Sequence, residues 1–273
     1  MADLGYAPSG DPRRPAVLFL HGFMGSSADW REVTASLETE YRCIAVDLPG
    51  HGSSLGLPPE AYTIDGTTGV LLNLLDELDV ERPLVVGYSM GGRLALYLAL
   101  RHPDLCSRLF LESASPGIED AAQREVRRNS DGEKAARLES GDLEGFLNDW
   151  YAQPLFASLA RRPEVLKRSI EARIRNDPTE LARSLRGMGT GEQPPLWGEL
   201  DALGIPTLVV AGELDERYAI ISAHMASLNP LIRARVVAGV GHNVHLEAPE
   251  ACLALLGCFL RDPGVTSPSS PHR

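Results

Sequence analysis

The segment Gly87-Tyr88-Ser89-Met90-Gly91 is a G-x-S-x-G motif, with an apolar run before it and apolar residues at helical spacing after it. Such a motif describes a sharp turn from a strand into a helix, in which the glycines remove side chains that would clash. The serine hydroxyl then projects beside a helix N-terminus, which favours negative charge. A chance turn of small residues is the alternative, and the strand and helix on either side disfavour it. We interpret Ser89 as the serine of a nucleophile elbow.

A serine of this kind needs a histidine and an acid that follow later strands. Asp215 follows one later apolar run and His242 follows the next, so the chain order is serine, acid, histidine. Glu213 competes with Asp215, and we expect Glu213 to be a solvated loop residue. His245 competes with His242, and we expect it to belong to the next helix. A metal site at the two histidines lacks a completing set of ligands.

The loop Leu20-His21-Gly22-Phe23-Met24-Gly25 follows the first buried run. In a site of this type, one backbone N–H from such a loop and one from the residue after the serine stabilise a developing oxyanion. We therefore assign these donors to the backbone of Phe23 and Met90. His21 could act as a proton shuttle, but its place at a strand end favours a structural role.

These residues require a parallel sheet that brings the strand ends together. Short apolar runs predict buried strands, and apolar side chains at helical spacing predict helices between them. The expected strands are Ala16–Leu20, Arg42–Val46, Leu84–Val86, Arg108–Leu111, Pro206–Ala211 and Arg235–Ala238. The expected helices are Ile64–Leu78, Met90–Arg101 and Pro249–Leu260. This alternation predicts an α/β fold with a mostly parallel twisted sheet and helices on both faces.

The middle of the chain differs, because it contains many charges, several prolines and no buried-strand run. We predict a core at 1–114 and 201–262 that is interrupted by a helical lid at 115–200. The tail 263–273 is rich in proline and serine, which predicts disorder.

Composition limits the partners. The chain has 273 residues, of which 44% are hydrophobic, and its net charge is −11. An acidic chain argues against a nucleic-acid-binding surface. No apolar run approaches a membrane span, and the N-terminus lacks the order of a signal peptide. We expect a cytoplasmic protein, monomeric or weakly homo-oligomeric, that acts on a small molecule.

The segments HGFMGSSADW, DLPGHGSS, GYSMGG, GELDERY and GVGHNVHLEAP together resemble the α/β-hydrolase superfamily, from about Ala16 to Leu260. The resemblance implies the α/β-hydrolase fold with a helical lid. It leaves the reaction open, because many chemistries share this fold.

Five finer segments are more specific: GYSMGGR, SPGI, QREVR, DWYAQPLFASL and GTGEQPPLW. Together they resemble the 2-succinyl-6-hydroxy-2,4-cyclohexadiene-1-carboxylate (SHCHC) synthases of menaquinone and phylloquinone synthesis. The resemblance implies a lyase that removes a proton from carbon and expels pyruvate from a cyclohexene polycarboxylate. It implies no metal and no organic cofactor, with Ser89, Asp215 and His242 acting together as the base.

The same resemblance implies three substrate-binding arginines, Arg93, Arg127 and Arg173, which would converge on the serine. Arginine suits carboxylates because its planar fork binds them at two points. A register error of one turn would give the roles to Arg124, Arg128 or Arg175 instead. Three aromatic residues are further candidates for substrate contact: Tyr88, Trp150 and Phe156. For the lid aromatics Trp150 and Phe156, packing within the lid is the alternative.

Two other functions remain open. A carboxylesterase or a carbon–carbon bond hydrolase would use the same triad through an acyl-enzyme. A receptor-like protein of this fold would bind its ligand without turning it over, and an intact triad argues against that.

Overall fold

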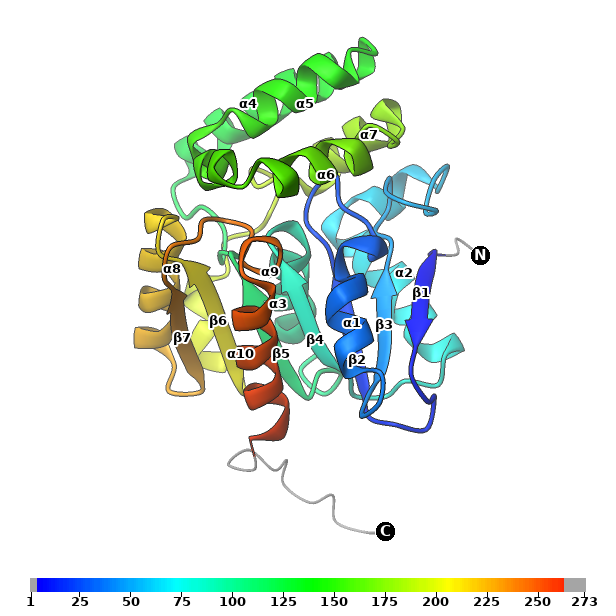
Figure 1. Ribbon diagram of the computed structural model, residues 1–273, viewed down its shortest axis with the longest axis vertical. Coiled ribbons are helices and arrows are strands. Elements are labelled where there is room, and N and C mark those ends of the chain that lie inside the picture. Colours follow the sequence, from blue (N-terminus) through cyan, green and yellow to red (C-terminus); the bar gives the residue numbers. More distant parts are fainter. Residues whose placement is uncertain (1–3, 263–273) are drawn as a thin grey trace.

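A computed structural model describes residues 4–262 of the chain, so the tail predicted to be disordered lies outside the described residues. These residues form a seven-stranded sheet in the order β1-β3-β2-β4-β5-β6-β7 (Figure 1). The strands are β1 Tyr6–Ser9, β2 Ala16–Leu20, β3 Arg42–Val46, β4 Leu84–Tyr88, β5 Arg108–Glu112, β6 Thr207–Gly212 and β7 Ile232–Val237. All neighbouring pairs are parallel except β1 with β3. The expected mostly parallel fold is therefore confirmed.

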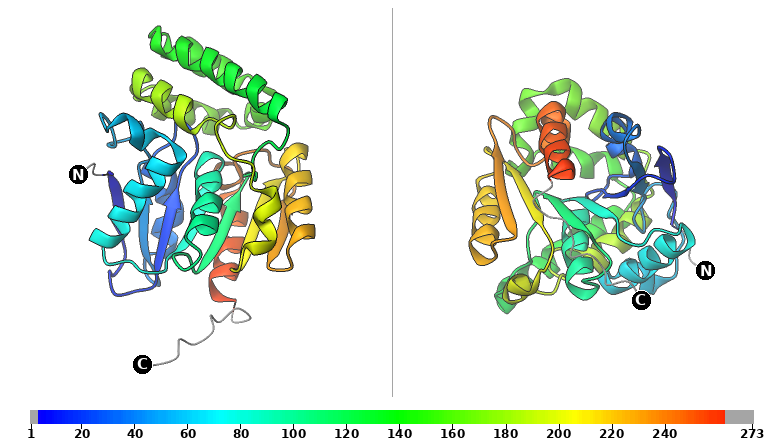
Figure 2. Two further views of the ribbon diagram at one scale, coloured as in Figure 1. Left: turned by 180° about the vertical axis from the view of Figure 1, so that it is seen from behind. Right: turned by 90° about the horizontal axis from the view of Figure 1, so that it is seen from below.

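Helices cover both faces of the sheet (Figures 1 and 2). One face carries α1 (Arg31–Leu37) and α10 (Pro249–Arg261), and the other carries α2 (Ile64–Glu77), α3 (Met90–Arg101) and α8 (Glu216–Leu228). Successive strand residues point to opposite faces, so each central strand feeds two apolar cores. In β2, for example, Leu18 packs with the α2 and α3 side, whereas Phe19 packs with the α1 and α10 side.

The central strands lie where the apolar runs predicted them, and the outer strands do not. β2 and β3 have the expected bounds, as does α3. β1 was not expected, because its four residues are largely exposed and form an antiparallel edge. β7 begins three residues earlier than expected, because this edge strand alternates arginines with apolar residues.

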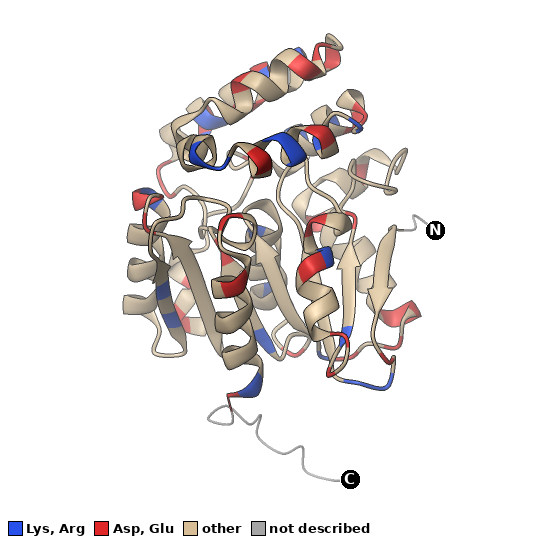
Figure 3. Ribbon diagram, in the orientation of Figure 1, with Lys and Arg blue, Asp and Glu red and all other residues tan. Residues whose placement is uncertain are grey.

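The segment between β5 and β6 forms a helical layer above the carboxyl ends of the strands (Figure 1). We call α4 (Ala121–Glu139), α5 (Leu143–Tyr151), α6 (Pro163–Arg173) and α7 (Pro178–Met188) the cap helices; the 3-10 segment η3 (Pro154–Arg161) joins α5 to α6. A separate apolar cluster within this layer includes Leu138, Leu147 and Leu181. Figure 3 shows Lys/Arg and Asp/Glu interspersed along the cap helices.

The remaining short elements are the 3-10 turns η1 (Ser27–Trp30), η2 (Pro59–Tyr62) and η4 (Trp197–Ala202) and the single-turn helix α9 (Val244–Glu247). Within residues 4–262, none of the helices combines the length and the apolar character needed to cross a bilayer.

Candidate active site

Ser89 occupies the turn between β4 and α3 in a strained conformation, with φ of +49° and ψ of −106°. A non-glycine residue rarely adopts a positive φ, so the surrounding structure must hold it there. The flanking glycines permit this: a Cβ on Gly91 would lie 2.3 Å from the carbonyl oxygen of Leu20, and one on Gly87 would lie 2.5 Å from that of Gly91. The turn is therefore the sharp strand-to-helix elbow that the motif predicts.

His242 lies between Ser89 and Asp215. The Ser89 hydroxyl is 3.2 Å from Nε2 of His242, and Nδ1 of His242 is 2.6 Å from Oδ2 of Asp215. Donation from Nδ1–H to the carboxylate leaves Nε2 free to accept the serine proton. The histidine and the aspartate side chains are 2% and 3% exposed, so water competes little for this hydrogen bond. The three residues thus form a chain along which a proton can move.

The competing residues have other partners. Glu213 lies in an exposed loop and accepts the backbone N–H of Gly239. His245 is the second residue of α9 and donates from Nδ1 to the buried carboxylate of Glu112, at 2.8 Å. The structure therefore brings Asp215 and His242, and not these alternatives, to Ser89.

Phe23 and Met90 flank the elbow. In residues 4–262, neither backbone N–H donates a hydrogen bond, so both are free to bind a developing oxyanion. His21 and His51 hold the loop that carries Phe23: His21 Nε2 accepts from Leu48 N–H and His51 Nε2 accepts from Met24 N–H. Burial lowers the pKa of both histidines, to about 3 for His51, and keeps them neutral acceptors.

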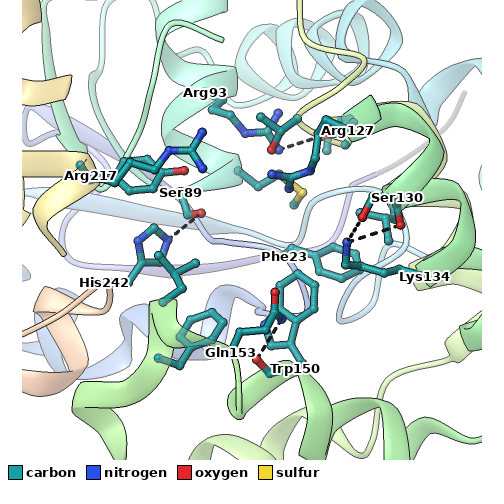
Figure 4. Close-up of a pocket in the computed structure, with 18 of the residues that line it drawn as sticks. Phe23, Ser89, Arg93, Arg127, Ser130, Lys134, Trp150, Gln153, Arg217 and His242 are labelled. Carbon is teal, nitrogen blue, oxygen red and sulfur yellow. Dashed lines mark hydrogen bonds between the residues drawn. The ribbon is translucent and has the colours of Figure 1, made fainter. Parts of the chain in front are cut away.

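A cavity of about 310 Å³ opens at Ser89, between the strand ends and the cap helices (Figure 4). This volume suits a small molecule. Among residues 4–262, four cationic side chains line it and no Asp or Glu does. The four are Arg93, Arg127, Lys134 and Arg217.

Arg93 follows Ser89 by one turn of α3 and is 8% exposed. Its guanidinium donates to the carbonyl oxygen of Met188 at 2.8 Å and to the Gln193 side chain at 3.5 Å, and no described carboxylate pairs with it. Burial lowers its pKa to about 10, so the group is still charged at neutral pH. A buried cation without a counter-ion favours an anionic ligand.

Arg127 enters the same cavity from α4. Its Nε donates to both carboxylate oxygens of Asp131, at 2.8 and 2.9 Å. The two terminal nitrogens have no partner within the described part of the chain, and Figure 4 shows the side chain reaching inward. Arg127 can therefore bind a carboxylate while Asp131 orients it.

Arg173 does not line the cavity with Arg93 and Arg127, so the structure does not bring the three expected arginines together at Ser89. This residue ends α6 and forms a two-point ion pair with Asp29, at 2.6 and 2.9 Å. Burial alone would lower the pKa of Arg173, but the charge and hydrogen bond of Asp29, together with the neighbouring Tyr151, raise it by more, so the net pKa is raised. It lines a separate cavity, together with Arg168 and Arg175. The ion pair with Asp29 thus holds the side chain away from the cavity at Ser89.

The register alternatives do not reach Ser89 either. Arg124 donates to the carbonyl oxygens of Ile118 and Glu119, and Arg128 pairs with Glu125 and Glu192. Arg175 lies on the separate cavity.

The reading of the sequence missed two cations that the structure places in the cavity. Lys134 comes seven residues after Arg127, which puts both on one face of α4, and this spacing could have revealed it. Arg217 comes two residues after Asp215, and Figure 4 shows it beside Ser89. It is exposed and has no hydrogen bond or ion pair with any other described residue.

The three candidate aromatic residues all line the cavity. Tyr88 is buried, and its hydroxyl donates to the Asn243 side chain at 2.7 Å rather than pointing freely at a ligand. Trp150 packs on Phe23 at 5.3 Å between ring centroids, and Phe156 meets the His242 ring edge-on at 5.9 Å. The lid aromatics therefore contribute both to packing and to the cavity wall.

No group of three or more His, Cys, Asp or Glu side chains among residues 4–262 is arranged to hold a metal ion.

Comparison with known proteins identifies the family. Residues 15–249 match the family described as alpha/beta hydrolase fold. A 2-succinyl-6-hydroxy-2,4-cyclohexadiene-1-carboxylate synthase from Serratia proteamaculans is 36% identical over 93% of this chain and 96% of its own length.

Two solved structures are similar. MenH from S. aureus superposes with a TM-score of 0.89 at 34% identity, over 96% of this chain and 98% of that one. A thermophilic esterase from Thermogutta terrifontis, with malate bound, superposes with a TM-score of 0.84 at 26% identity, over 94% and 93% of the two chains. This chain belongs to the α/β-hydrolase fold family and, within it, to the family of 2-succinyl-6-hydroxy-2,4-cyclohexadiene-1-carboxylate synthases.

Proposed function

We propose that this protein is a carbon–oxygen lyase of menaquinone or phylloquinone biosynthesis. Its substrate is 2-succinyl-5-enolpyruvyl-6-hydroxy-3-cyclohexene-1-carboxylate, and its products are pyruvate and 2-succinyl-6-hydroxy-2,4-cyclohexadiene-1-carboxylate. One observation carries the proposal beyond family membership: the Ser89–His242–Asp215 chain opens into a cavity with four cations and no carboxylate. Such a cavity suits a substrate with three carboxylates.

The triad supplies the base. The ring carbon beside the succinyl ketone loses its proton to His242, directly or through Ser89. Asp215 stabilises the protonated histidine and holds its tautomer. The electron pair of the broken C–H bond moves onto the ketone oxygen.

The backbone donors then stabilise the charge that develops. We assign this role to the N–H groups of Phe23 and Met90, which donate no hydrogen bond within the described residues. As the charge returns through the ring double bond, the carbon–oxygen bond to the enolpyruvyl group breaks. The leaving enolate takes up a proton and becomes pyruvate, and the ring is left as a conjugated diene. Arg93 and Arg127 bind carboxylates of the substrate and place the reacting carbon beside His242.

The test supplies the enolpyruvyl substrate and follows pyruvate, through lactate dehydrogenase and NADH, together with diene absorbance. We expect both products to appear at equal rates. Ser89→Ala should lower kcat by about a thousandfold or more, because the triad acts as a unit. Ser227→Ala, which alters an exposed serine on α8, is the matched control. Unchanged pyruvate release in Ser89→Ala would refute this mechanism.

A carboxylesterase or carbon–carbon bond hydrolase is the second candidate, and the esterase of similar structure favours it. Such an enzyme forms an acyl-enzyme, so nitrophenyl acetate should give a burst of nitrophenol equal to the enzyme present. A lyase should show no burst and slow turnover of the ester. A burst without pyruvate release would decide for the hydrolase.

A further inference from the structure

Lys134 is the cavity cation for which neither the elbow nor the family motifs provide a role. It belongs to α4 and lies two helical turns after Arg127. Figure 4 shows its ammonium group entering the cavity from the side opposite Ser89 and His242, with Phe23 and Trp150 between. It is also one of only two lysines in the chain, the other being Lys167.

The surroundings leave the Lys134 charge largely uncompensated. Its Nζ donates to Oγ of Ser130 at 2.7 Å and to the Ser130 carbonyl oxygen at 3.4 Å. Asp131 is the one described carboxylate within 4 Å, at 3.9 Å, and it already accepts two hydrogen bonds from Arg127. An ammonium has three donors, so at least one is available to a ligand.

The side chain is also partly removed from water, because it is 30% exposed. Burial lowers the pKa of Lys134, and the charge of Asp131 opposes this only in part. An anion at Nζ would replace the lost hydration and restore the preference for the charged form. The charge of the cavity excludes a cationic ligand at this point, since Arg127 stands on the same helix face.

We propose that Lys134 is a specificity-determining residue that binds a substrate carboxylate at the end of the cavity remote from Ser89. This rests on the proposed function, whose substrate carries two carboxylates away from the ring: that of the succinyl group and that of the enolpyruvyl group. Arg93 and Arg217 stand beside Ser89, so they are placed for groups near the reacting carbon. Lys134 is placed for a group several bonds away. Ser130 orients the ammonium toward it.

The experiment measures binding and turnover separately. The binding probe is 2-(3-carboxypropanoyl)benzoate, a stable dicarboxylate that has the succinyl and ring carboxylates but no leaving group. Its partner, 2-butanoylbenzoate, lacks the succinyl carboxylate. Dissociation constants follow from the quenching of tryptophan fluorescence, since Trp150 lines the cavity. The variants are Lys134→Gln and Lys134→Arg, with Lys167→Gln on the exposed side of α6 as the control.

If Lys134 binds the succinyl carboxylate, Lys134→Gln should weaken binding of the dicarboxylate probe about tenfold or more and leave binding of the monocarboxylate probe unchanged. If Lys134 instead binds the enolpyruvyl carboxylate, Lys134→Gln should bind both probes as the wild type does. The KM of the elimination should then rise about tenfold, with kcat little changed. Lys134→Arg should restore most of either loss, because it keeps the charge. Lys167→Gln should match the wild type throughout.

Unchanged probe affinities together with an unchanged KM would overturn the proposal. If the wild type releases no pyruvate, the proposed function fails on its own. The two probes then still decide the carboxylate site, because their binding needs no turnover, and equal affinities in wild type and Lys134→Gln would overturn it.

Discussion

Arg173 of the cap and Asp29 of the core form a two-point ion pair in which both side chains are at most 10% exposed. The pair joins the end of α6 to η1, directly after the loop that carries Phe23. Asn176 adds a second tie, since its side-chain amide donates to the Met24 carbonyl oxygen at 2.9 Å. The cap is therefore attached to the loop that carries Phe23.

Breaking this pair should cost stability more than catalysis. Arg173→Met leaves the Asp29 carboxylate buried without its partner, which should lower the free energy of unfolding by about 3–5 kcal/mol. The double variant Arg173→Met/Asp29→Leu should recover much of that loss, because no lone charge remains. Urea unfolding of the single and double variants measures both effects. If the double variant regains stability but its KM is still raised tenfold or more, this result would indicate that Arg173 binds the substrate.

Arg93 should act mainly in the transition state. Its buried guanidinium has no described counter-ion and stands one turn from Ser89, so a carboxylate bound to it holds the reacting carbon in place while charge develops during proton removal. Arg93→Ala should lower kcat/KM by about a hundredfold, with most of the loss in kcat. Arg101→Ala is the control on the same helix, since Arg101 pairs with Glu199 at the surface. Wild-type kcat/KM in Arg93→Ala would contradict this role.

Arg217 should act in the capture of substrate. It is exposed at the cavity and unpaired within the described residues, so it attracts anions but is well screened by salt. Arg217→Gln should raise KM by roughly threefold to tenfold at low ionic strength and by less at high ionic strength. Arg175→Gln, on the separate cavity, should change neither value. Steady-state kinetics at two salt concentrations measure both variants. A KM of Arg217→Gln equal to that of the wild type at low ionic strength, or a raised KM in Arg175→Gln, would contradict this role.

His51 should make the fold sensitive to acid. Burial, and next the neighbouring His21, lower the pKa of His51 to about 3, whereas an unfolded histidine titrates near pH 6.5. Between those values the unfolded chain binds the extra proton, so the free energy of unfolding falls as the pH falls. The slope from one such histidine approaches about 1.4 kcal/mol per pH unit.

His51→Gln should keep the contacts to Met24 and Pro49 and remove the titration. Urea unfolding at pH 7, 6 and 5 should then give a wild-type stability that converges on that of the variant as the pH drops. Asp47 and His21 are present in both proteins, so the difference isolates the titration of His51 together with its charge interaction with His21. Parallel curves would show that His51 does not carry the effect.

The sequence predicted the site residues at the strand ends better than the site residues on the cap helices. Ser89 and Asp215 follow continuous apolar strands, and His242 follows the next strand, β7. A parallel sheet brings such strand ends together whatever their separation in the chain. Arg127, Lys134 and Arg173 lie on cap helices instead. The rotation of each helix depends on its packing against the core, and local spacing does not determine that.

The edge strand β1 was missed for a related reason. Its side chains are mostly exposed, so burial leaves no apolar pattern in them, and only backbone pairing with β3 defines it. The Arg173–Asp29 pair likewise joins residues far apart in the chain, and nothing near Arg173 in the sequence indicates Asp29.

The adjacency of β5 and β6 has a consequence for how such enzymes diversify. The two strands pair directly, with Leu111 opposite Val209, although the whole cap lies between them in the chain. An insertion whose two ends are neighbours can be exchanged for a longer or shorter one at a small cost in loop entropy. We therefore expect the cap to be exchangeable as a unit. A different cap grafted between β5 and β6 would bring other substrates to Ser89, His242 and Asp215 and leave the sheet intact.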